Sequence, residues 1–356
     1  MTLESHLSNV TRRDWERTSP QGTVRVAVVG VGGFAAERAV PALSAARYAD
    51  VAALVTGSPD RVRPLAEDVG ADTVIDYETF RTGDHTDAYD AVYVATPNAL
   101  HGEYAIAAAR QGVHVICEKP LDVSTGRARE IVDACADADV TLMTAYRLQV
   151  EPLVRRAREL VRADVIGRVV QVHGAFSNPL LEYATPDTWR LHGDLAGGGA
   201  LVDLGIYPLN TTRFLLDADP VAVFATTHSS GDLFASVDEH VAFQLHFPGG
   251  ATASCTASFS GAPDSSLRLI GTEGTISISS PFGGAVSQQL RVDRADLCLE
   301  NTGEPTDEVR EEFDYFGYCV LTDTTPEPDG ADGIADLRVI EAAYESAATG
   351  KLVYVE

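Results

Sequence analysis

The sequence predicts an α/β protein built from two domains. Its 356 residues exceed the usual size of one domain, and 45% of them are hydrophobic, which is enough for two cores. From Val24 to about residue 144, short apolar segments alternate with alanine-rich segments, a pattern typical of βαβ units around a parallel sheet. Beyond that point, strand-like segments follow one another with few helices between them, which indicates a largely antiparallel sheet.

We expect a polar N-terminal arm (1–22), a first domain (23–145) and a second domain (146–356). The first domain should contain strands at 24–29, 51–55, 73–75, 91–95, 113–117 and 140–144, and helices at 33–46, 60–69, 100–111 and 124–138. The second should contain helices at 151–162, 200–216 and 331–348, with strands at 168–176, 221–228, 238–247, 250–260, 266–270, 274–279, 287–293 and 352–355. Residues 301–312 and 323–333 are expected to be acidic loops.

These elements follow from runs of apolar residues and from the turn residues between them. Ser124 offers a cap for the helix 124–138, and Gly112 offers a stop for the helix 100–111. In the second domain, clusters such as Pro248-Gly249-Gly250 separate one strand from the next.

The chain is strongly acidic. Asp and Glu number 52 against 27 Lys and Arg, a formal net charge of −25, and lysine occurs only at Lys119 and Lys351. Such charge repels itself at low salt, whereas molar salt shortens the Debye length to about 3 Å. The composition therefore indicates a halophilic protein of a salt-rich cytosol, with an ordinary acidic cytosolic enzyme as the alternative. It disfavours nucleic-acid binding because no basic stripe is present.

Cysteine usage and hydropathy bear on location. The five cysteines are scattered and form no C-x-x-C pair, so a reducing compartment fits better than a disulfide framework, and no zinc spacing is present. The first residues lack the apolar core of a signal peptide. No apolar run approaches the roughly 18 residues of a membrane helix. We expect a soluble cytoplasmic protein with no metal site and no membrane contact.

A glycine-rich turn follows the first expected strand. Residues 30–35, Gly-Val-Gly-Gly-Phe-Ala, match G-x-G-x-x-A between a strand and a helix. Glycines allow a tight turn and close approach of a ligand, and a helix N-terminus attracts a pyrophosphate. Glycine-rich turns are common, but in this context the motif predicts dinucleotide binding. The residues expected to contact the dinucleotide are Gly30, Gly32, Gly33, Phe34 and Ala35.

The end of the second strand bears on which dinucleotide binds. NAD sites usually place an Asp or Glu there for the ribose hydroxyls. Here Thr56-Gly57-Ser58 carries no acid, while Ser58 and Arg61 could hold the 2′-phosphate of NADP. These residues and Thr56 therefore favour NADP, with Arg63 as a further candidate. The alternative is a surface turn with an incidental arginine.

Two more strand ends should lie beside each other in the parallel sheet. Thr96-Pro97-Asn98, followed by His101, ends one strand and could line the nicotinamide side of a crevice, so these residues are expected to contact the cofactor. His101 alone fits a cap or packing residue better than a catalytic base. Glu118-Lys119-Pro120 ends the next strand. A chain that keeps so few lysines places one here, so Lys119 is the first candidate for chemistry. A cis peptide at Pro120 would aim Lys119 into the cleft, although trans is the commoner form.

A second group of candidates follows the glycine run Gly197-Gly198-Gly199. Asp203 and Tyr207 lie four residues apart on the expected helix, so they share one face. A phenol ordinarily has a pKa near 10 and needs a neighbouring cation to serve as a base near neutrality. Lys119 could supply that charge, and Asp203 could orient the substrate or the lysine. A helix-cap aspartate and a packed tyrosine would explain the pair alone, but the three residues together indicate a catalytic set.

These ordered motifs resemble those of the Gfo/Idh/MocA oxidoreductase family, from about residue 23 to the C-terminus. Trp189-Arg190-Leu191 ahead of the glycine run, and Tyr207 where many relatives have histidine, are similar to the glucose–fructose oxidoreductase and aldose 1-dehydrogenase branch. The resemblance implies a Rossmann domain followed by an α/β domain with a large, mostly antiparallel open sheet. That sheet commonly mediates dimers or tetramers, so a homo-oligomer is implied.

The resemblance also implies roles for residues. Lys119, Asp203 and Tyr207 match catalytic positions, and this branch tends to use NADP. The activity implied is oxidation of a cyclic aldose at C1 to an aldonolactone, with the sugar bound between the domains, Tyr207 as the base and D-xylose favoured over D-glucose. The residues implied to contact the cofactor are Glu118, Lys119, Arg147, Trp189 and Arg190.

Three alternatives stay open. The first is glucose–fructose-type transfer between two sugars on a tightly bound NADP, against which the lack of a secretion signal and of a long proline-rich arm weighs. The second is a non-catalytic dinucleotide sensor, which would be expected to lose part of the catalytic set. The third is reduction of an osone, imine or dihydrodiol, which shares every motif.

Overall fold

The computed structural model describes residues 13–283, 288–295, 297–302 and 306–356. The chain forms two compact units. We call Asp14–Arg147 together with Asp307–Ile334 the Rossmann unit, and Leu148–Thr306 together with Ala335–Glu356 the sheet unit. This division differs from the expected single boundary near residue 145, because the chain returns to the Rossmann unit at Asp307.

The expected N-terminal arm belongs to the Rossmann unit from Asp14 onward. Trp15 is buried there, with its ring centroid 5.2 Å from that of Tyr315 and 5.3 Å from that of Tyr318. Aromatic packing therefore ties this part of the arm to the unit, where a separate polar arm was expected. Arm residues 1–12 lie outside the described part of the chain.

The Rossmann unit contains a parallel sheet, as predicted. Its strands are β1 (Val24–Val29), β2 (Ala49–Val55), β3 (Thr73–Ile75), β4 (Ala91–Val94), β5 (His114–Cys117) and β6 (Leu142–Thr144). They are hydrogen-bonded in the order β3-β2-β1-β4-β5-β6, and each pair is parallel. In this fold a dinucleotide binds at the carboxyl ends of the strands where the order reverses, here between β1 and β4.

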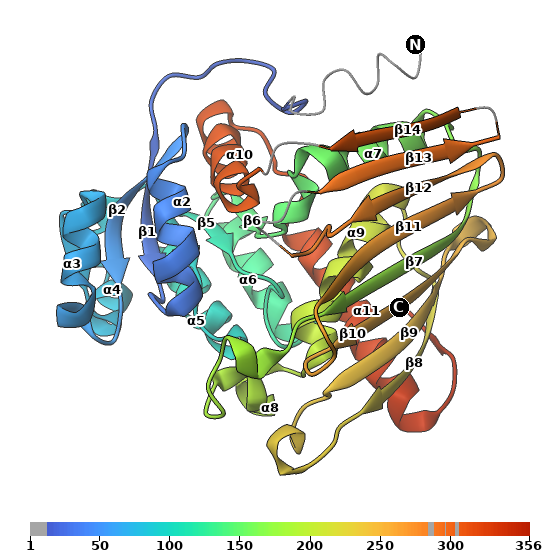
Figure 1. Cartoon of the computed structure of the whole chain (residues 1–356). Helices are drawn as coiled ribbons and strands as arrows, with labels where there is room; N and C mark the ends of the chain where they lie inside the picture. Colours follow the sequence, from blue (N-terminus) through green and yellow to red (C-terminus); the bar gives the residue numbers. More distant parts are fainter. Residues whose placement is uncertain (1–12, 284–287, 296, 303–305) are drawn as a thin grey trace. The chain divides into compact units, whose positions relative to one another are not determined.

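Helices pack around this sheet (Figure 1). Asp76 and Ser124 cap two of them by accepting the backbone N–H groups of Thr79 and Arg127, and Gly70 ends a third in a left-handed conformation. The helices of the unit are α2 (Val40–Ser44), α3 (Pro59–Val69), α4 (Tyr77–Thr82), α5 (His101–Arg110), α6 (Thr125–Asp137), α10 (Glu308–Thr322) and the first turn of α11 (Gly330–Thr349).

The sheet unit contains a nine-stranded sheet. Its strands are β7 (Val169–Ser177), β8 (Ala222–His228), β9 (His240–His246), β10 (Thr252–Ser258), β11 (Asp264–Gly271), β12 (Gly274–Ser279), β13 (Gln289–Arg294), β14 (Leu297–Thr302) and β15 (Val353–Tyr354). Their order is β14-β13-β12-β11-β7-β10-β9-β8-β15, and β7 pairs with β10 in parallel while the other described pairs are antiparallel. The predicted large, mostly antiparallel sheet is confirmed, and β14 is an additional strand.

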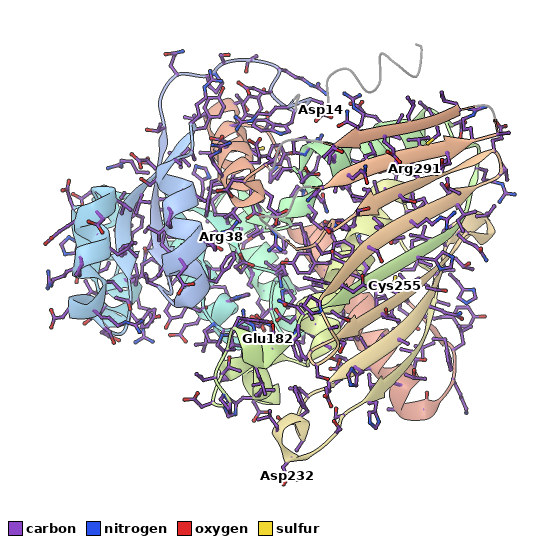
Figure 2. All side chains as sticks on the ribbon, in the orientation of Figure 1. Asp14, Arg38, Glu182, Asp232, Cys255 and Arg291 are labelled. Carbon is purple, nitrogen blue, oxygen red and sulfur yellow. The ribbon has the colours of Figure 1, made fainter. Side chains whose placement is uncertain are left out.

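One face of the nine-stranded sheet is covered by helices and the other is exposed. Helices α7 (Pro152–Arg162), α9 (Ile206–Leu216) and the later part of α11 lie against the first face (Figure 1). Buried side chains such as Cys255, labelled in the middle of the sheet in Figure 2, point to that side. We call the opposite side, which carries alternate residues such as His173, Gln244 and Ser254, the open face.

Two of the predicted helices begin with a wide π turn. The helix expected at 33–46 starts as the π turn Ala35–Ala39 and continues as α2, which contains Pro41. The helix expected at 200–216 starts as the π turn Leu201–Gly205 and continues as α9, which contains Pro208. Proline lacks a backbone N–H and crowds the carbonyl four residues before it, so the wider turn relieves that crowding.

Helix α10 corrects the prediction of an acidic loop at 301–312. It begins at Glu308, and its carboxyl groups at Glu308, Glu311, Glu312 and Asp314 are all buried. Asp314, for example, accepts the backbone N–H groups of Arg47 and Tyr48. The prediction failed because it took acidic composition as a sign of exposure.

No described helix has the length and apolar character needed to cross a membrane. The five cysteines are unpaired thiols, of which Cys298 is exposed and the other four are buried.

Candidate active site

The glycine turn after β1 leaves its backbone open to a ligand. Gly30 has a φ of +96°, and a Cβ there would lie 2.9 Å from the carbonyl of Ala95, so the position requires glycine. By contrast, a Cβ on Gly32 or Gly33 would meet nothing within 4 Å. Phe34 beside them is exposed and Ala35 is buried under the helix start. This is the arrangement that lets backbone N–H groups at a helix N-terminus approach a pyrophosphate.

The loop after β2 carries the candidates for the adenosine end of a dinucleotide. The buried hydroxyl of Thr56 accepts the backbone N–H of Ser58 at 3.3 Å. The Arg61 guanidinium donates to the carbonyl of Val31 at 3.3 Å, which joins this loop to the glycine turn. Arg63 instead pairs with Asp60 at 3.1 Å on the surface of α3.

Tyr77, an aromatic residue that no sequence motif indicated, also lies in this region. A Cβ on Gly57 would lie 3.4 Å from the Tyr77 ring, and that ring is 5.0 Å, centroid to centroid, from the ring of Tyr104. The charge of Arg61 acts on the Tyr77 phenol, whose pKa is raised by burial. Only the position of Tyr77, two residues after the short strand β3, could have indicated it.

His101 joins the turns after β4 and β5. Its ring is fully buried, with one nitrogen 3.0 Å from the carbonyl oxygen of Thr96 and the other 2.9 Å from that of Pro120. Burial lowers the pKa of His101. Both nitrogens therefore face the protein, so His101 positions the two turns, which revises the expectation that it contacts a cofactor directly.

Thr96 retains an unused polar atom at the place where the strand order reverses. Its Oγ1 is buried and has no hydrogen-bond partner among the described residues, and its Cγ2 would lie 2.9 Å from a Cβ on Gly30. Pro97 is half-buried beside it, and Asn98 is buried. A buried hydroxyl without a partner beside an open glycine turn fits a site that a dinucleotide completes.

The motif after β5 holds the candidate lysine. The Lys119–Pro120 peptide bond is cis, where the commoner trans form was expected. The Glu118 carboxylate accepts the backbone N–H of Lys119 at 3.2 Å and the hydroxyl of Tyr93 at 2.5 Å. The Lys119 side chain itself is half-buried. Glu118 is therefore held from both sides, and its orientation is coupled to the backbone of Lys119.

A buried acidic group accompanies this motif within the Rossmann unit. Arg147 pairs with the Glu308 carboxylate at 2.5 Å. Glu312 is 2% exposed, and in the part of the chain that the structure describes its Oε1 has no hydrogen-bond partner. Burial, reinforced by the charge of Glu118, raises the pKa of Glu312 well above its usual value, and burial also raises the pKa of Glu308. These acids were missed because they lie on α10, which was not predicted.

In the sheet unit, Arg190 contacts both Trp189 and Asp203, and Tyr207 lies on the helix that follows Asp203. Asp203 lies in the π turn before α9, and Tyr207 is the second residue of α9. The Arg190 guanidinium donates to the Asp203 carboxylate at 3.1 Å and lies 4.6 Å from the centroid of the Trp189 ring. The loop that carries Trp189 and Arg190 thus reaches the helix that carries the candidate acid and phenol.

Aromatic side chains surround Tyr207. Its ring centroid is 5.3 Å from that of Phe176, edge to face, and 6.1 Å from that of Phe282. Tyr183, 48% exposed, stands in the same group, because the charges of Asp203 and Arg190 act on its phenol, whose pKa is raised chiefly by desolvation. Phe176, Phe282 and Tyr183 were not selected from the sequence, since aromatic residues on strands and loops more often signal a core.

The two groups of candidates belong to different units. Lys119 and Arg147 are in the Rossmann unit, whereas Trp189, Arg190, Asp203 and Tyr207 are in the sheet unit. Among the described residues, no group of three or more His, Cys, Asp or Glu side chains is placed to hold a metal ion.

A Rossmann unit with an open glycine turn, combined with a unit that presents an acid and a phenol, defines a dinucleotide-dependent oxidoreductase. Residues 24–146 match the family model described as "Oxidoreductase family, NAD-binding Rossmann fold", and residues 154–277 match the "GFO/IDH/MocA C-terminal domain". The chain belongs to the GFO/IDH/MocA family, which confirms the resemblance stated above.

Within this family, the chain is similar to proteins with named activities on sugars. A protein of Haloarcula marismortui named D-xylose 1-dehydrogenase [NADP(+)] is 43% identical over 362 aligned positions that cover 100% of both chains. D-xylose 1-dehydrogenase (NADP(+)) 2 of Haloferax volcanii is 34% identical and covers 92% of this chain and 99% of its own. Among solved structures, an aldose–aldose oxidoreductase of Caulobacter crescentus complexed with glycerol superposes with a TM-score of 0.87 at 34% identity, over 94% of this chain and 100% of its own.

Proposed function

We propose that this protein is an NADP-dependent aldose 1-dehydrogenase that oxidises D-xylose at C1, with D-glucose as the next candidate. The observation that carries the proposal is the 43% identity over the full length to an NADP-dependent D-xylose 1-dehydrogenase. The candidate residues support it, because Lys119, Asp203 and Tyr207 are all present. Arg190 pairs with Asp203, and Tyr207 acts on the same Tyr183 phenol as that pair.

The Rossmann unit fits NADP. The open backbone at Gly32 and Gly33 suits the pyrophosphate, and the absence of an acid at the end of β2 leaves room for a 2′-phosphate near Ser58 and Arg61. Once bound, NADP supplies the hydride acceptor. The residues that we propose to hold it are Gly30, Gly32, Gly33, Phe34, Ala35, Thr56, Ser58, Arg61, Thr96, Pro97, Asn98, Glu118, Lys119, Arg147, Trp189 and Arg190.

Three side chains have separate roles in the proposed proton transfer. We assign Tyr207 as the general base that takes the proton from the C1 hydroxyl of the sugar. Lys119 supplies a positive charge that favours the ionised phenol and donates a hydrogen bond to the sugar. Asp203 is already held by Arg190, so we assign it to orienting the substrate and the base. Phe176 and Phe282 pack against the Tyr207 ring and help to hold the phenol in place.

The test is reduction of NADP by a panel of aldoses in molar salt, with NAD compared in parallel. Turnover with D-xylose and preference for NADP are expected. Folded protein that binds NADP but reduces none with any aldose would overturn the dehydrogenase proposal and favour a sensor or a reductase.

Sugar-to-sugar transfer is the second candidate, favoured by the structural similarity to an aldose–aldose oxidoreductase. In that reaction the cofactor would be reduced by one sugar and reoxidised by another without leaving. NADP that copurifies with the protein, together with sugar oxidation that releases no NADPH, would support this candidate.

We further propose that the open face mediates a homo-oligomer. Strands β7, β8, β9, β10 and β12 contain no Asp or Glu, although the chain has 52 of them. The part of the open face formed by these strands therefore carries no acidic side chain, whereas β13 and β14 at one edge of the sheet carry Arg291, Asp293 and Glu300. The acid-free part is suited to contact with a second copy, because no carboxylates need to approach each other there.

A charged substitution on the open face tests this assembly. Ser254→Glu would place a carboxylate at the centre of the face, between His173 and Gln244, and should lower the mass measured by light scattering. Ala136→Glu on the exposed side of α6 is the matched control and should leave the mass unchanged. Equal mass for both variants and the unmodified protein would contradict assembly through the open face.

We also propose that the protein works in a salt-rich cytoplasm. The net charge of −25 and the near absence of lysine support a halophilic protein, and five unpaired cysteines are compatible with a reducing compartment.

A further inference from the structure

The segment that carries Asp203 and Tyr207 begins without a cap of its own. The first N–H groups of a helix have no partners within the helix. Ala200, which precedes the π turn, offers no side-chain hydrogen bond, and the three residues before it are glycines. The N–H groups of Gly199, Ala200 and Leu201 must therefore be satisfied from elsewhere in the fold.

Asp238, two residues before the start of β9, supplies the missing acceptors. One oxygen of its carboxylate accepts the N–H of Gly199 at 2.7 Å, and the other accepts the N–H of Leu201 at 2.8 Å. Its backbone carbonyl accepts the N–H of Ala200 at 2.8 Å. Asp238 is 7% exposed, so these bonds are shielded from water. A carboxylate at a helix N-terminus is also favoured by the helix dipole.

Tyr344 of α11 completes the arrangement. Its hydroxyl donates to the Asp238 carboxylate at 2.6 Å and accepts the N–H of Gly199 at 3.2 Å. Burial and the neighbouring charge of Asp238 raise the pKa of Tyr344 well above its usual value. The phenol therefore keeps its proton and serves as a donor.

The glycine run makes this close contact possible. A Cβ on Gly198 would overlap the hydroxyl of Tyr344, and a Cβ on Gly199 would overlap the backbone carbonyl of Asp238. Side chains at these positions would force Asp238 and Tyr344 away from the helix start. The run is thus explained by the approach of these two residues.

A second contact from α11 holds α9 farther along. The buried Asp336 carboxylate accepts the side-chain amide of Asn210 at 2.9 Å and the guanidinium of Arg213 at 2.6 Å. Asp203 and Tyr207 lie between this contact and the one at Gly199. The direction of the segment is therefore fixed at both ends.

We infer that Asp238 and Tyr344 are positioning residues for the reaction, which hold the start of the catalytic segment so that Asp203 and Tyr207 present their polar groups in one fixed orientation. The inference rests on the proposed catalytic role of Asp203 and Tyr207. Neither Asp238 nor Tyr344 is assigned a contact with the sugar or with NADP.

The test compares Asp238→Asn and Tyr344→Phe with Ser346→Ala. Ser346 is the matched control, because it is also buried on α11 and its hydroxyl accepts the N–H of Ala225, away from the catalytic segment. Misplacement of catalytic groups by about 1 Å can cost on the order of 100-fold in rate. We expect kcat to fall by roughly 10- to 100-fold in Asp238→Asn and about 10-fold in Tyr344→Phe, with the KM for NADP unchanged. Ser346→Ala should lower the Tm as Tyr344→Phe does while keeping kcat.

The outcomes separate this inference from the proposed function. If both variants keep the kcat of the unmodified protein and lose only stability, as Ser346→Ala is expected to, Asp238 and Tyr344 are structural and the inference is wrong. In that case, loss of activity in Tyr207→Phe would still leave the proposed function intact. If instead Tyr207→Phe keeps full activity, the proposed catalytic set itself fails.

Discussion

At the scale of single residues, the proposed chemistry depends on one ammonium group in a chain that has nearly abandoned lysine. Lys119 and Lys351 are its two lysines, and only Lys119 lies at the carboxyl end of a Rossmann strand, after β5. Arginine offers a larger, more rigid and more weakly hydrated cation than lysine does. We propose that lysine is retained at position 119 because the reaction needs a compact charge that can approach a phenol and a sugar hydroxyl.

Lys119→Met should abolish most of the turnover, because it removes the charge that we propose favours the ionised phenol of Tyr207. We expect kcat to fall by about 100-fold or more, as is typical when acid–base catalysis is disabled. Lys351→Met, on the exposed C-terminal segment, is the matched control and should keep full activity. Near-normal turnover by Lys119→Met would remove Lys119 from the mechanism.

The stability of the protein should depend on pH through Glu312. Burial raises the pKa of Glu312 in the folded protein above its usual value. Folding therefore favours the protonated form, and the stability that this group contributes is lost as the pH rises from the unfolded pKa toward the folded pKa. Glu312→Gln cannot ionise, so its Tm relative to the unmodified protein should rise between pH 5 and pH 8.

Thermal unfolding in molar salt at pH 5 and at pH 8 measures the Tm difference between Glu312→Gln and the unmodified protein. A Tm difference that does not change with pH would show that Glu312 has an ordinary pKa in the folded state.

The sequence identified the polar site residues better than their surroundings. Asp203, Trp189 and Arg190 were selected from motifs, and Arg190 does contact the other two, while Tyr207, also selected, acts on the same Tyr183 phenol as Asp203 and Arg190. Tyr77, Tyr183 and Phe282 were missed because their neighbours come from distant parts of the chain. His101 was selected by its place in a motif, and only the structure shows both ring nitrogens turned to backbone carbonyls.

At the scale of elements, the turn between β1 and its helix tests the dinucleotide site. Gly30→Ala would place a methyl group against the backbone of Ala95 at an unfavourable positive φ, so we expect a loss of about 1–2 kcal/mol of stability and weaker binding of NADP. Gly126→Ala, in α6 with open space around it, is the control and should be neutral or stabilising by up to about 1 kcal/mol. Fluorescence titration with NADP measures the binding.

If Gly30→Ala bound NADP as tightly as Gly126→Ala, the glycine turn would not be the pyrophosphate site.

Most elements were predictable because their periodicity is local. All six Rossmann strands were predicted, since parallel strands buried on both faces are continuous apolar runs bounded by turn residues. The π turns before Pro41 and Pro208 were not predicted, because the relief of proline crowding leaves no composition signal. Helix α10 was not predicted because its carboxyl groups find partners only in the folded chain.

At the scale of the whole molecule, charge decides the conditions under which the protein is stable. A net charge of −25 repels itself unless salt screens it. We expect the Tm to rise steadily from dilute buffer to molar KCl and the far-UV circular dichroism of the folded chain to be lost on dialysis to low salt. A Tm that is the same in dilute buffer would contradict the halophilic assignment.

The division of the chain into units could not be predicted from the order of segments alone. Residues 307–334 follow the large sheet in sequence but belong to the Rossmann unit. Apolar and aromatic residues such as Trp15, Tyr315 and Phe313 show why, since they pack within that unit. Sequence patterns report which residues are buried and not which core they enter.

The most direct test of the account is the rate of NADPH formation from D-xylose and NADP in molar salt, measured for the unmodified protein and for Tyr207→Phe after both are shown to bind NADP. The account predicts turnover by the unmodified protein and a loss of about 100- to 10,000-fold in the variant, whose phenyl ring cannot take the C1 hydroxyl proton. Equal rates for the two proteins, or no turnover by an unmodified protein that binds NADP, would contradict it.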